Sequence, residues 1–205
     1  MDITSLNGGT VIAMRGNECV TIGSDLRLGS RFLTIMNDKE KIYKFGDRLY
    51  LGIGGLATDA QTIVQRLNFR KSAYELRENR PMKPKTFMHM LSNMLYEKRF
   101  GPYFCEPVVA GLDPVTFEPY IAMTDSIGCI DSPKDFVASG TGQMQLIGTC
   151  ETYWENNLDA DGLFEATAQS LLSAIERDAS SGWGAVVYTV TKDGVSAKSL
   201  KARLD

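Results

Sequence analysis

The first 27 residues constrain the fold more than any other part of the sequence. Residues 10–14 are β-branched and apolar, residues 15–17 have the composition of a tight turn, and residues 18–24 return to strand composition. Two strands joined by so short a turn predict an antiparallel hairpin. The hairpin is expected to bring Asp25 back to the start of the first strand. A carboxylate is therefore predicted beside Gly9, where strand-end side chains commonly line sites.

The rest of the sequence alternates between groups of strands and pairs of helices. Strands are predicted at residues 28–36, 41–45, 49–53, 108–110, 119–124, 127–130, 136–138, 184–191 and 195–200. Helices are predicted at 58–79, opened by a capping box at 58–61, from Pro84 to before Gly101, at 143–153 and from Asp159 onward. Several strands are apolar on both faces and must be covered on both sides. We therefore expect an α+β fold, a four-layer α-β-β-α sandwich of two antiparallel sheets flanked by helix pairs.

Composition limits the function classes that remain. The 205 residues fit a single domain, 1–205, and 43% of them are apolar, which is enough for a core. The net charge of −3 gives no basic field for nucleic acid, and no apolar run approaches the ~20 residues of a membrane span, so neither partner is expected. The first residues do not have the composition of a secretory signal, and the four cysteines form no Cys-x-x-Cys. A cytoplasmic or nuclear protein without zinc is expected.

The opening hairpin resembles that of the proteasome beta-type subunits, which are N-terminal nucleophile hydrolases. The resemblance implies the four-layer fold of that superfamily. In active members a propeptide ending in Gly is removed, and the exposed Thr supplies the nucleophilic hydroxyl and, through its free amine, the general base. Aligning Asp25 and Arg27 with the family's Asp-x-Arg, without a gap, places Gly8 on the glycine before the cleaved bond and Gly9 on the threonine. Since glycine has no hydroxyl, the resemblance implies a noncatalytic member.

Further motifs match the family in the same order along nearly the whole chain. Lys41 falls where the family's buried Lys lowers the pKa of the nucleophile, and Gly55 matches the glycine whose N–H donates to the oxyanion. Thr141 replaces a Ser of the family's Gly-Ser-Gly, and Arg-Asp-x-x-Ser-Gly recurs at residues 177–182. The implied remnant of an active-site framework is Gly9, Asp25, Lys41, Gly55, Thr141, Asp178 and Ser181. We interpret its charged members as a structural ion-pair cluster, since removing one partner of a buried pair costs about 3–5 kcal/mol.

Two other functions fit parts of the sequence. Thr10 also follows a Gly, so cleavage after Gly9 would give an active threonine endopeptidase. Successive strand residues point to opposite faces, however, so Thr10 is expected to point away from Asp25, and the sequence still carries nine residues before it. Residues 140–142, Gly-Thr-Gly, are compatible with a nucleotide or small-molecule site, but the third glycine of the dinucleotide motif and its βαβ context are missing. A noncatalytic subunit is the preferred hypothesis.

Residues 100–104, 125–129 and 181–184 resemble one noncatalytic type of beta subunit. The resemblance implies a ring of seven beta subunits in the 20S core particle, stacked on a second such ring and capped by alpha rings. It further implies that the assembled particle carries out ATP- and ubiquitin-dependent degradation of protein substrates in its chamber. The resemblance also implies that Asp125 and Cys129 contribute to the pocket of the adjacent trypsin-like subunit, where an acidic group suits basic side chains. The alternative is that both are ordinary loop residues.

The resemblance implies no cofactor, apart from a structural Mg²⁺ that family members can hold at a subunit contact. The implied ligands are main-chain carbonyls near the loop of Asp178 and Ser181, together with the carboxy terminus of a partner subunit. Hard oxygen ligands of this kind suit Mg²⁺. The terminal residue Asp205 is a candidate for the second contribution.

Overall fold

The opening hairpin lies at the centre of a five-stranded antiparallel sheet. The computed structural model describes residues 3–203, and the order of this sheet is β10-β1-β2-β11-β12. Its strands are β1 (Thr10–Arg15), β2 (Cys19–Asp25), β10 (Phe136–Gly140), β11 (Ala185–Thr191) and β12 (Val195–Leu200). Every residue of β2 is buried, so the hairpin is an interior element rather than a surface one.

A second five-stranded antiparallel sheet has the order β5-β6-β7-β8-β9, in which each strand pairs with the next along the chain. Its strands are β5 (Ile42–Gly46), β6 (Leu49–Gly55), β7 (Cys105–Leu112), β8 (Pro119–Thr124) and β9 (Ile130–Asp131). A separate two-stranded sheet and a short 3-10 helix complete the strand-rich part: β3 (Leu28–Ser30), β4 (Leu33–Met36) and η1 (Ile3–Ser5). The second sheet is therefore a meander.

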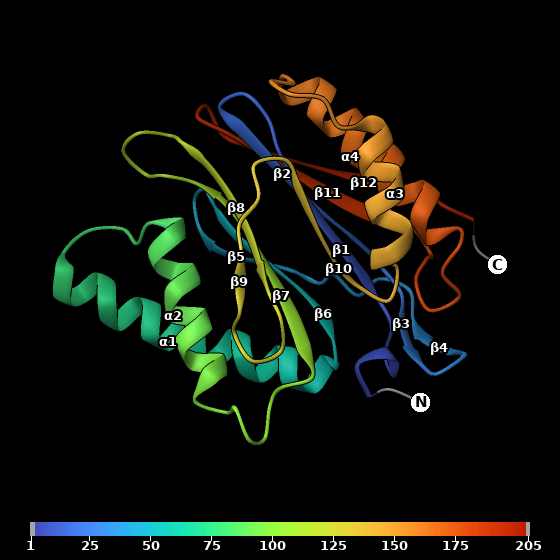
Figure 1. Cartoon of the computed structure of the whole chain (residues 1–205), viewed down its shortest axis with the longest axis horizontal. Helices are drawn as coiled ribbons and strands as arrows, with labels where there is room; N and C mark the ends of the chain where they lie inside the picture. The colour runs from blue at the N-terminus through green and yellow to red at the C-terminus, as the bar shows by residue number, and fades with distance from the viewer. Residues whose placement is uncertain (1–2, 204–205) are drawn as a thin grey trace.

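Two helix pairs cover the outer faces of the sheets. The helices are α1 (Ala57–Glu78), α2 (Pro84–Tyr96), α3 (Gln143–Tyr153) and α4 (Ala160–Ile175). Figure 1 shows α1 and α2 on the side of the second sheet and α3 and α4 on the side of the first. Within residues 3–203, none of the helices combines the length and apolar character of a membrane span.

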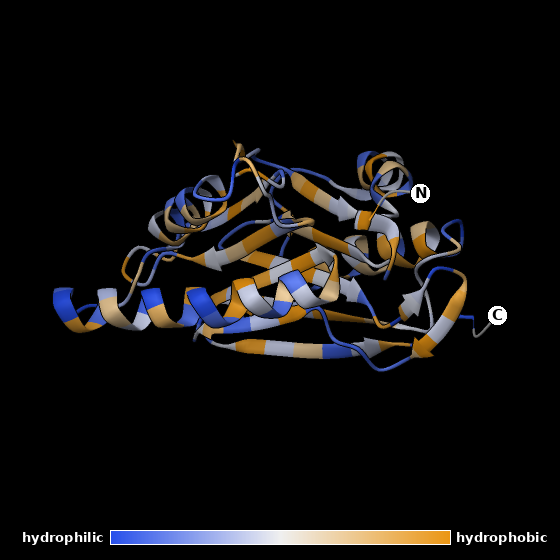
Figure 2. Ribbon diagram, turned by 90° about the horizontal axis from the view of Figure 1, so that it is seen from below, coloured by the Kyte–Doolittle hydropathy of each residue, from blue (hydrophilic) through white to orange (hydrophobic). Residues whose placement is uncertain are grey.

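Three hydrophobic clusters separate the layers. One contains Phe87 of α2 with Val109 of the second sheet, and another contains Leu171 of α4 with Ile12 of the first. The third lies between the sheets and includes Val11, so two successive residues of β1 enter different clusters. In Figure 2 the strands carry long hydrophobic stretches, as expected for sheets that are buried on both faces. The helices mix hydrophobic and hydrophilic residues, as expected for helices that are buried on one face only. The predicted four-layer α-β-β-α sandwich is confirmed.

The predicted hairpin is also confirmed. β1 and β2 pair antiparallel from Val11 opposite Ser24 to Arg15 opposite Val20. This register brings the end of β2 to the start of β1, because one tight turn joins the two strands. The candidate functional site described below depends on this arrangement, because it includes Asp25 at the end of β2.

Two predicted strands are not continuous strands in the structure, and a third, predicted at 108–110, is only the middle of β7. The single strand expected at 28–36 is divided into β3 and β4 by a turn in which Arg31 has a positive φ of 59°. The strand expected at 127–130 is a loop followed by the two-residue β9. In that loop the Asp125 side chain accepts hydrogen bonds from the N–H groups of Ile127 and Cys129. A side chain that bonds nearby amides competes with a strand ladder.

The capping box predicted at residues 58–61 is wrong. Helix α1 begins at Ala57, one residue before Thr58, and its N-cap residue makes no side-chain hydrogen bond. The N–H of Ala57 instead donates to Asn7 Oδ1 at 3.0 Å. This contact crosses 50 positions of sequence, so the local pattern could not contain it. The other helix starts follow the sequence, with Pro84 in the first turn of α2 and Asp159 capping α4.

Candidate functional site

Asp25 is the centre of a buried ionic cluster at the end of β2, and it is 0% exposed to solvent. Oδ1 accepts hydrogen bonds from the N–H of Thr10 and from Lys41 Nζ, both at 2.9 Å. Oδ2 accepts from the N–H of Arg27 at 3.1 Å and of Gly182 at 3.2 Å. One carboxylate therefore ties together β1, β2, the segment before β5 and the loop before β11.

Lys41 is the ionic partner of this carboxylate. Lys41 is buried, and its Nζ also donates to the main-chain oxygen of Asp25 at 3.0 Å. Burial lowers the pKa of Lys41, and the neighbouring Asp25 carboxylate opposes that shift. Since both groups have left water, each depends on the other to offset its desolvation.

Gly9 faces this lysine. A Cβ added at Gly9 would lie 2.4 Å from Cε of Lys41 and 3.3 Å from its Nζ. The φ of Gly9 is +118°, a backbone conformation that L side chains rarely adopt. The position that the alignment gives to the nucleophile therefore does point at the lysine, but it carries no group that can attack a carbonyl.

A cluster of hydroxyl groups around Asp178 reaches the carbonyl of Gly9 through Thr141. Oδ2 of Asp178 accepts from Thr141 Oγ1 at 2.5 Å and from Ser181 Oγ at 2.6 Å. The N–H of Thr141 donates to the Gly9 carbonyl at 3.0 Å. The structure therefore brings Thr141 together with Asp178 and Ser181, which lie in one loop, beside Gly9.

Thr10 has different neighbours from Gly9. Its Oγ1 lies 2.7 Å from Ser181 Oγ and accepts the N–H of Gly142 at 3.0 Å. Thr10, the first residue of β1, and Gly9, which precedes it, thus face different groups, and Lys41 is the neighbour of Gly9. This arrangement follows from the alternation of side chains along a strand.

Gly55 ends β6 and lines a cavity of about 350 Å³ together with Gly140 and Cys105. Its φ is +110°, and a Cβ there would lie 2.3 Å from the carbonyl oxygen of Phe104, so only glycine fits. Burial, aided by nearby Asp59, raises the pKa of the Cys105 thiol to about 12. At neutral pH this thiol is protonated and is a poor nucleophile.

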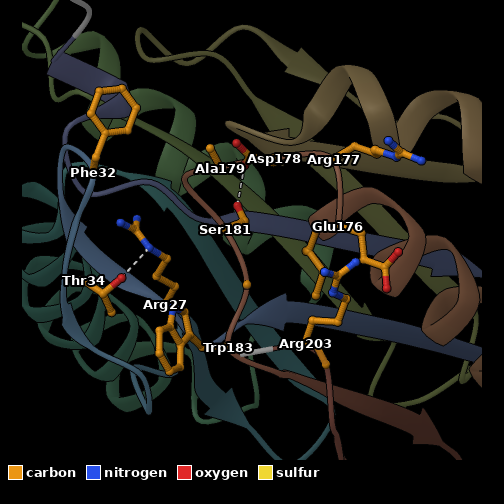
Figure 3. A pocket seen from close by; sticks show the side chains of 13 residues that line it. Arg27, Phe32, Thr34, Glu176, Arg177, Asp178, Ala179, Ser181, Trp183 and Arg203 are labelled. Carbon is orange, nitrogen blue, oxygen red and sulfur yellow. Dashed lines mark hydrogen bonds between the residues drawn. The ribbon is translucent and has the colours of Figure 1, made fainter. Parts of the chain in front are cut away.

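Arg27 is a buried residue of the site that the sequence analysis did not assign. Its Nε donates to Thr34 Oγ1 at 3.0 Å, and its Nη1 donates to the carbonyl of Ser180 at 2.9 Å. Figure 3 shows Arg27 and Thr34 beside a cavity of about 600 Å³ that Ser181 also lines. Arg27 thus fixes the loop that carries Ser181. The available signal was its place two residues after Asp25 in the family motif.

Asp125 and Cys129 come from another element, the exposed loop between β8 and β9. Oδ1 of Asp125 accepts from the N–H of Ile127 at 3.0 Å and of Cys129 at 2.8 Å. Gly128 has a φ of +93°, and its carbonyl accepts a hydrogen bond from Ser92 Oγ of α2. The loop is therefore held in one shape, with an acidic residue on the surface.

Within residues 3–203, no group of three or more His, Cys, Asp or Glu side chains could hold a metal ion. The carboxylate of Asp178 is already bonded to Thr141, Ser181 and the N–H of Ser180. Asp205, the other candidate contribution, lies outside the described residues. The Mg²⁺ stays a prediction.

Comparison with known proteins agrees with the geometry. The family model described as proteasome subunit matches residues 5–190. The chain is 56% identical over 205 residues to proteasome subunit beta type-3 of Caenorhabditis elegans and 54% identical to that of Drosophila melanogaster, with all of both chains covered in each case. It is 50% identical over 204 residues to proteasome subunit beta type-3 of Saccharomyces cerevisiae, covering all of this chain and 99% of the relative. The chain therefore belongs to the proteasome subunit family, and it is similar over its whole length to the beta type-3 subunits.

Proposed function

We propose that the chain is a noncatalytic structural subunit of the beta ring of the 20S core particle. Its partners are other beta subunits and the alpha ring, and protein substrates pass through the chamber that it helps to enclose. Sister subunits cut these substrates, in ATP- and ubiquitin-dependent degradation in the cytoplasm and nucleus. The observation that carries the proposal is Gly9, which faces Lys41 without a hydroxyl group.

The competing function is an active threonine endopeptidase with Thr10 as its processed first residue. The contacts of Thr10 favour the noncatalytic role. Its nitrogen lies 2.9 Å from the Asp25 carboxylate. Its Oγ1 is bonded to Ser181 and to the N–H of Gly142, whereas Lys41, which would lower the pKa of a nucleophilic hydroxyl, lies against Gly9.

Mass measurement tests the proposal. In native mass spectrometry of the purified protein, we expect the chain within a 20S particle, and after denaturation an intact chain that still contains Gly9. Treatment with a covalent threonine-directed inhibitor should leave this chain unmodified, while the active sister subunits of the same particle gain the adduct and serve as the control. A chain that begins at Thr10, or an adduct on Thr10, would overturn the proposal.

We further propose that Asp125, with Cys129, contributes to the substrate pocket of the adjacent trypsin-like subunit. The carboxylate lies on an exposed loop whose shape is fixed by its own hydrogen bonds and by Ser92. A negative charge at the edge of such a pocket attracts basic side chains of a substrate and disfavours acidic ones. This role goes with assembly, because the pocket belongs to the neighbouring subunit.

Asp125→Asn is expected to lower kcat/KM of the particle for cleavage after basic residues by about two- to tenfold, the effect of removing one partly screened charge. Asn keeps an oxygen that accepts the amides of Ile127 and Cys129, so the loop is preserved and the loss reports the charge. Asp125→Ala removes both features and should reduce this cleavage at least as much. Cleavage after apolar residues, measured on the same particles, is the control. Unchanged kinetics in both variants would remove the pocket role and leave the structural role standing.

A further inference from the structure

Asn7 and Gly8 form the only Asn-Gly pair in the sequence. An asparagine is chemically labile when glycine follows it, because no side chain keeps the next main-chain nitrogen away from Cγ, the carbon of the side-chain amide. In an unfolded chain, residue 7 is therefore the asparagine expected to lose its amide fastest. In the folded chain the same residue lies in the segment before β1, residues 3–8, here called the amino-terminal arm.

Loss of this amide needs water and nothing else from outside the chain. The main-chain nitrogen of Gly8 attacks Cγ of Asn7, and the new N–Cγ bond closes a succinimide ring. The Cγ–Nδ2 bond breaks, and the leaving nitrogen takes up the proton of the Gly8 N–H and departs as ammonia. Water then opens the ring at either of its carbonyl groups, which gives aspartate or isoaspartate at residue 7.

In the folded chain both ends of the Asn7 side-chain amide are hydrogen-bonded, and to different elements. Nδ2 donates to the carbonyl of Gly29 in β3 at 2.9 Å, and Oδ1 accepts the N–H of Ala57, the first residue of α1, at 3.0 Å. Ring closure makes Cγ tetrahedral and moves its oxygen and nitrogen out of their common plane. The reaction therefore has to break contacts that hold these two atoms in place.

The main chain on both sides of the Asn7–Gly8 bond is held as well. The N–H of Arg31 donates to the main-chain oxygen of Leu6 at 2.8 Å, and the N–H of Gly29 donates to that of Asn7 at 3.0 Å. Gly8 has a φ of +67°, and a Cβ there would lie 2.1 Å from the carbonyl oxygen of Ser180. A movement of the Gly8 nitrogen toward Cγ therefore disturbs closely packed main chain.

We propose that Asn7 is a deamidation site that the seated arm shields, so that its modification marks chains whose arm has been out of place. Neither product restores the original contacts. In aspartate an oxygen replaces Nδ2 and would face the carbonyl oxygen of Gly29. In isoaspartate the main chain is longer at residue 7, between Leu6 and Gly9, whose main-chain oxygens are both hydrogen-bonded. The inference does not depend on the noncatalytic role, because it concerns the arm and not the nucleophile.

The rate of amide loss in the folded and the denatured protein tests the proposal. The purified protein, with and without urea, is kept at neutral pH, and a brief trypsin digestion then releases residues 1–15. Asn7 is the only asparagine of this peptide, so the mass it gains on deamidation reports residue 7 alone. We expect a rate at least about tenfold lower in the folded protein, since hydrogen bonds to the amide must break first. A synthetic peptide of residues 1–15, kept in both solvents, corrects for the effect of urea. Equal rates after this correction would overturn the proposal.

A pair of variants at Arg31 tests whether the arm is the shield. The side chain of Arg31 is exposed, its φ is 59°, and its N–H is the group that holds Leu6. Arg31→Pro removes this N–H and cannot adopt the positive φ, so amide loss at Asn7 should become several-fold faster in the folded protein. Arg31→Gly keeps the N–H and adopts the same φ readily, so it is the matched control and should react as slowly as the wild type. A folded Arg31→Pro protein that reacts as slowly as Arg31→Gly would overturn the proposal. If Arg31→Pro does not fold, the comparison of folded and denatured wild type still decides.

Discussion

Replacing Asp25 by Asn is expected to lower the free energy of unfolding by about 3–5 kcal/mol at pH 7, because a buried lysine is left without its ionic partner. Lys41 is only 6% exposed, and its Nζ makes two hydrogen bonds to Asp25. Asn has nearly the same volume as Asp and keeps an oxygen acceptor, so the loss measures the charge rather than a cavity. Urea unfolding of the purified chain gives the difference.

The stability lost in Asp25→Asn should depend on pH. Burial lowers the pKa of Lys41 below its ordinary 10.5, and the carboxylate that opposes this shift is absent from the variant. Between the lowered pKa of the folded state and about 10.5, the unfolded chain binds more protons than the folded one, so the stability of the variant rises with pH. The deficit relative to the wild type should therefore narrow from pH 7 toward pH 10. A deficit that is constant over this range would contradict a loss caused by charge.

Asp47→Asn is the matched control for this experiment. Asp47 also pairs with a lysine, but the distance to Lys44 is 3.8 Å and the side chain of Asp47 is 94% exposed. Exposed pairs of this kind contribute little to stability. The free energy of unfolding should therefore stay nearly unchanged, at any pH in the range.

The sequence predicts those parts of the site that short motifs specify. The register of β1 and β2 follows from two strands and one tight turn, and it brings Asp25 to Thr10. Asp178 and Ser181 belong to one motif three residues apart, and they share a hydrogen bond. Thr141 could be placed beside them only through the resemblance, because 37 positions separate it from Asp178.

The contacts of Arg27 and Asn7 could not be predicted from short sequence motifs. Arg27 reaches the carbonyl of Ser180 across 153 positions, and Asn7 reaches Ala57 across 50. Both hydrogen bonds involve a main-chain atom. Because every residue has the same main-chain atoms, the residue type at that position does not indicate the contact. The capping box at 58–61 failed for the same reason, since a distant side chain had already bonded the first amide of α1. Local patterns predict the elements, and packing decides which distant groups complete them.

Gly9→Thr restores the side chain that the family alignment lacks, yet it is expected to destabilise the protein by about 2–5 kcal/mol and to give no peptidase activity. The φ of +118° is strained for any L side chain, and the new Cβ would lie 2.4 Å from Cε of Lys41. Lys41 cannot move aside cheaply, because its Nζ is bonded to the buried Asp25 carboxylate. In the described chain residue 9 is also joined to Gly8, so no free amine is available as the general base.

Gly9→Ala separates the two causes of this result. Ala introduces the same Cβ and the same strain without a hydroxyl, so most of the stability loss should already appear in it. Gly101→Ala is the control, because a Cβ there meets nothing within 4 Å and the free energy of unfolding should change little. If Gly9→Thr were as stable as the wild type and accepted a threonine-directed inhibitor, the missing hydroxyl would be the only difference from an active subunit. If the variant is destabilised and unreactive, as expected, the backbone at residue 9 is itself adapted to glycine, and one substitution cannot restore the activity.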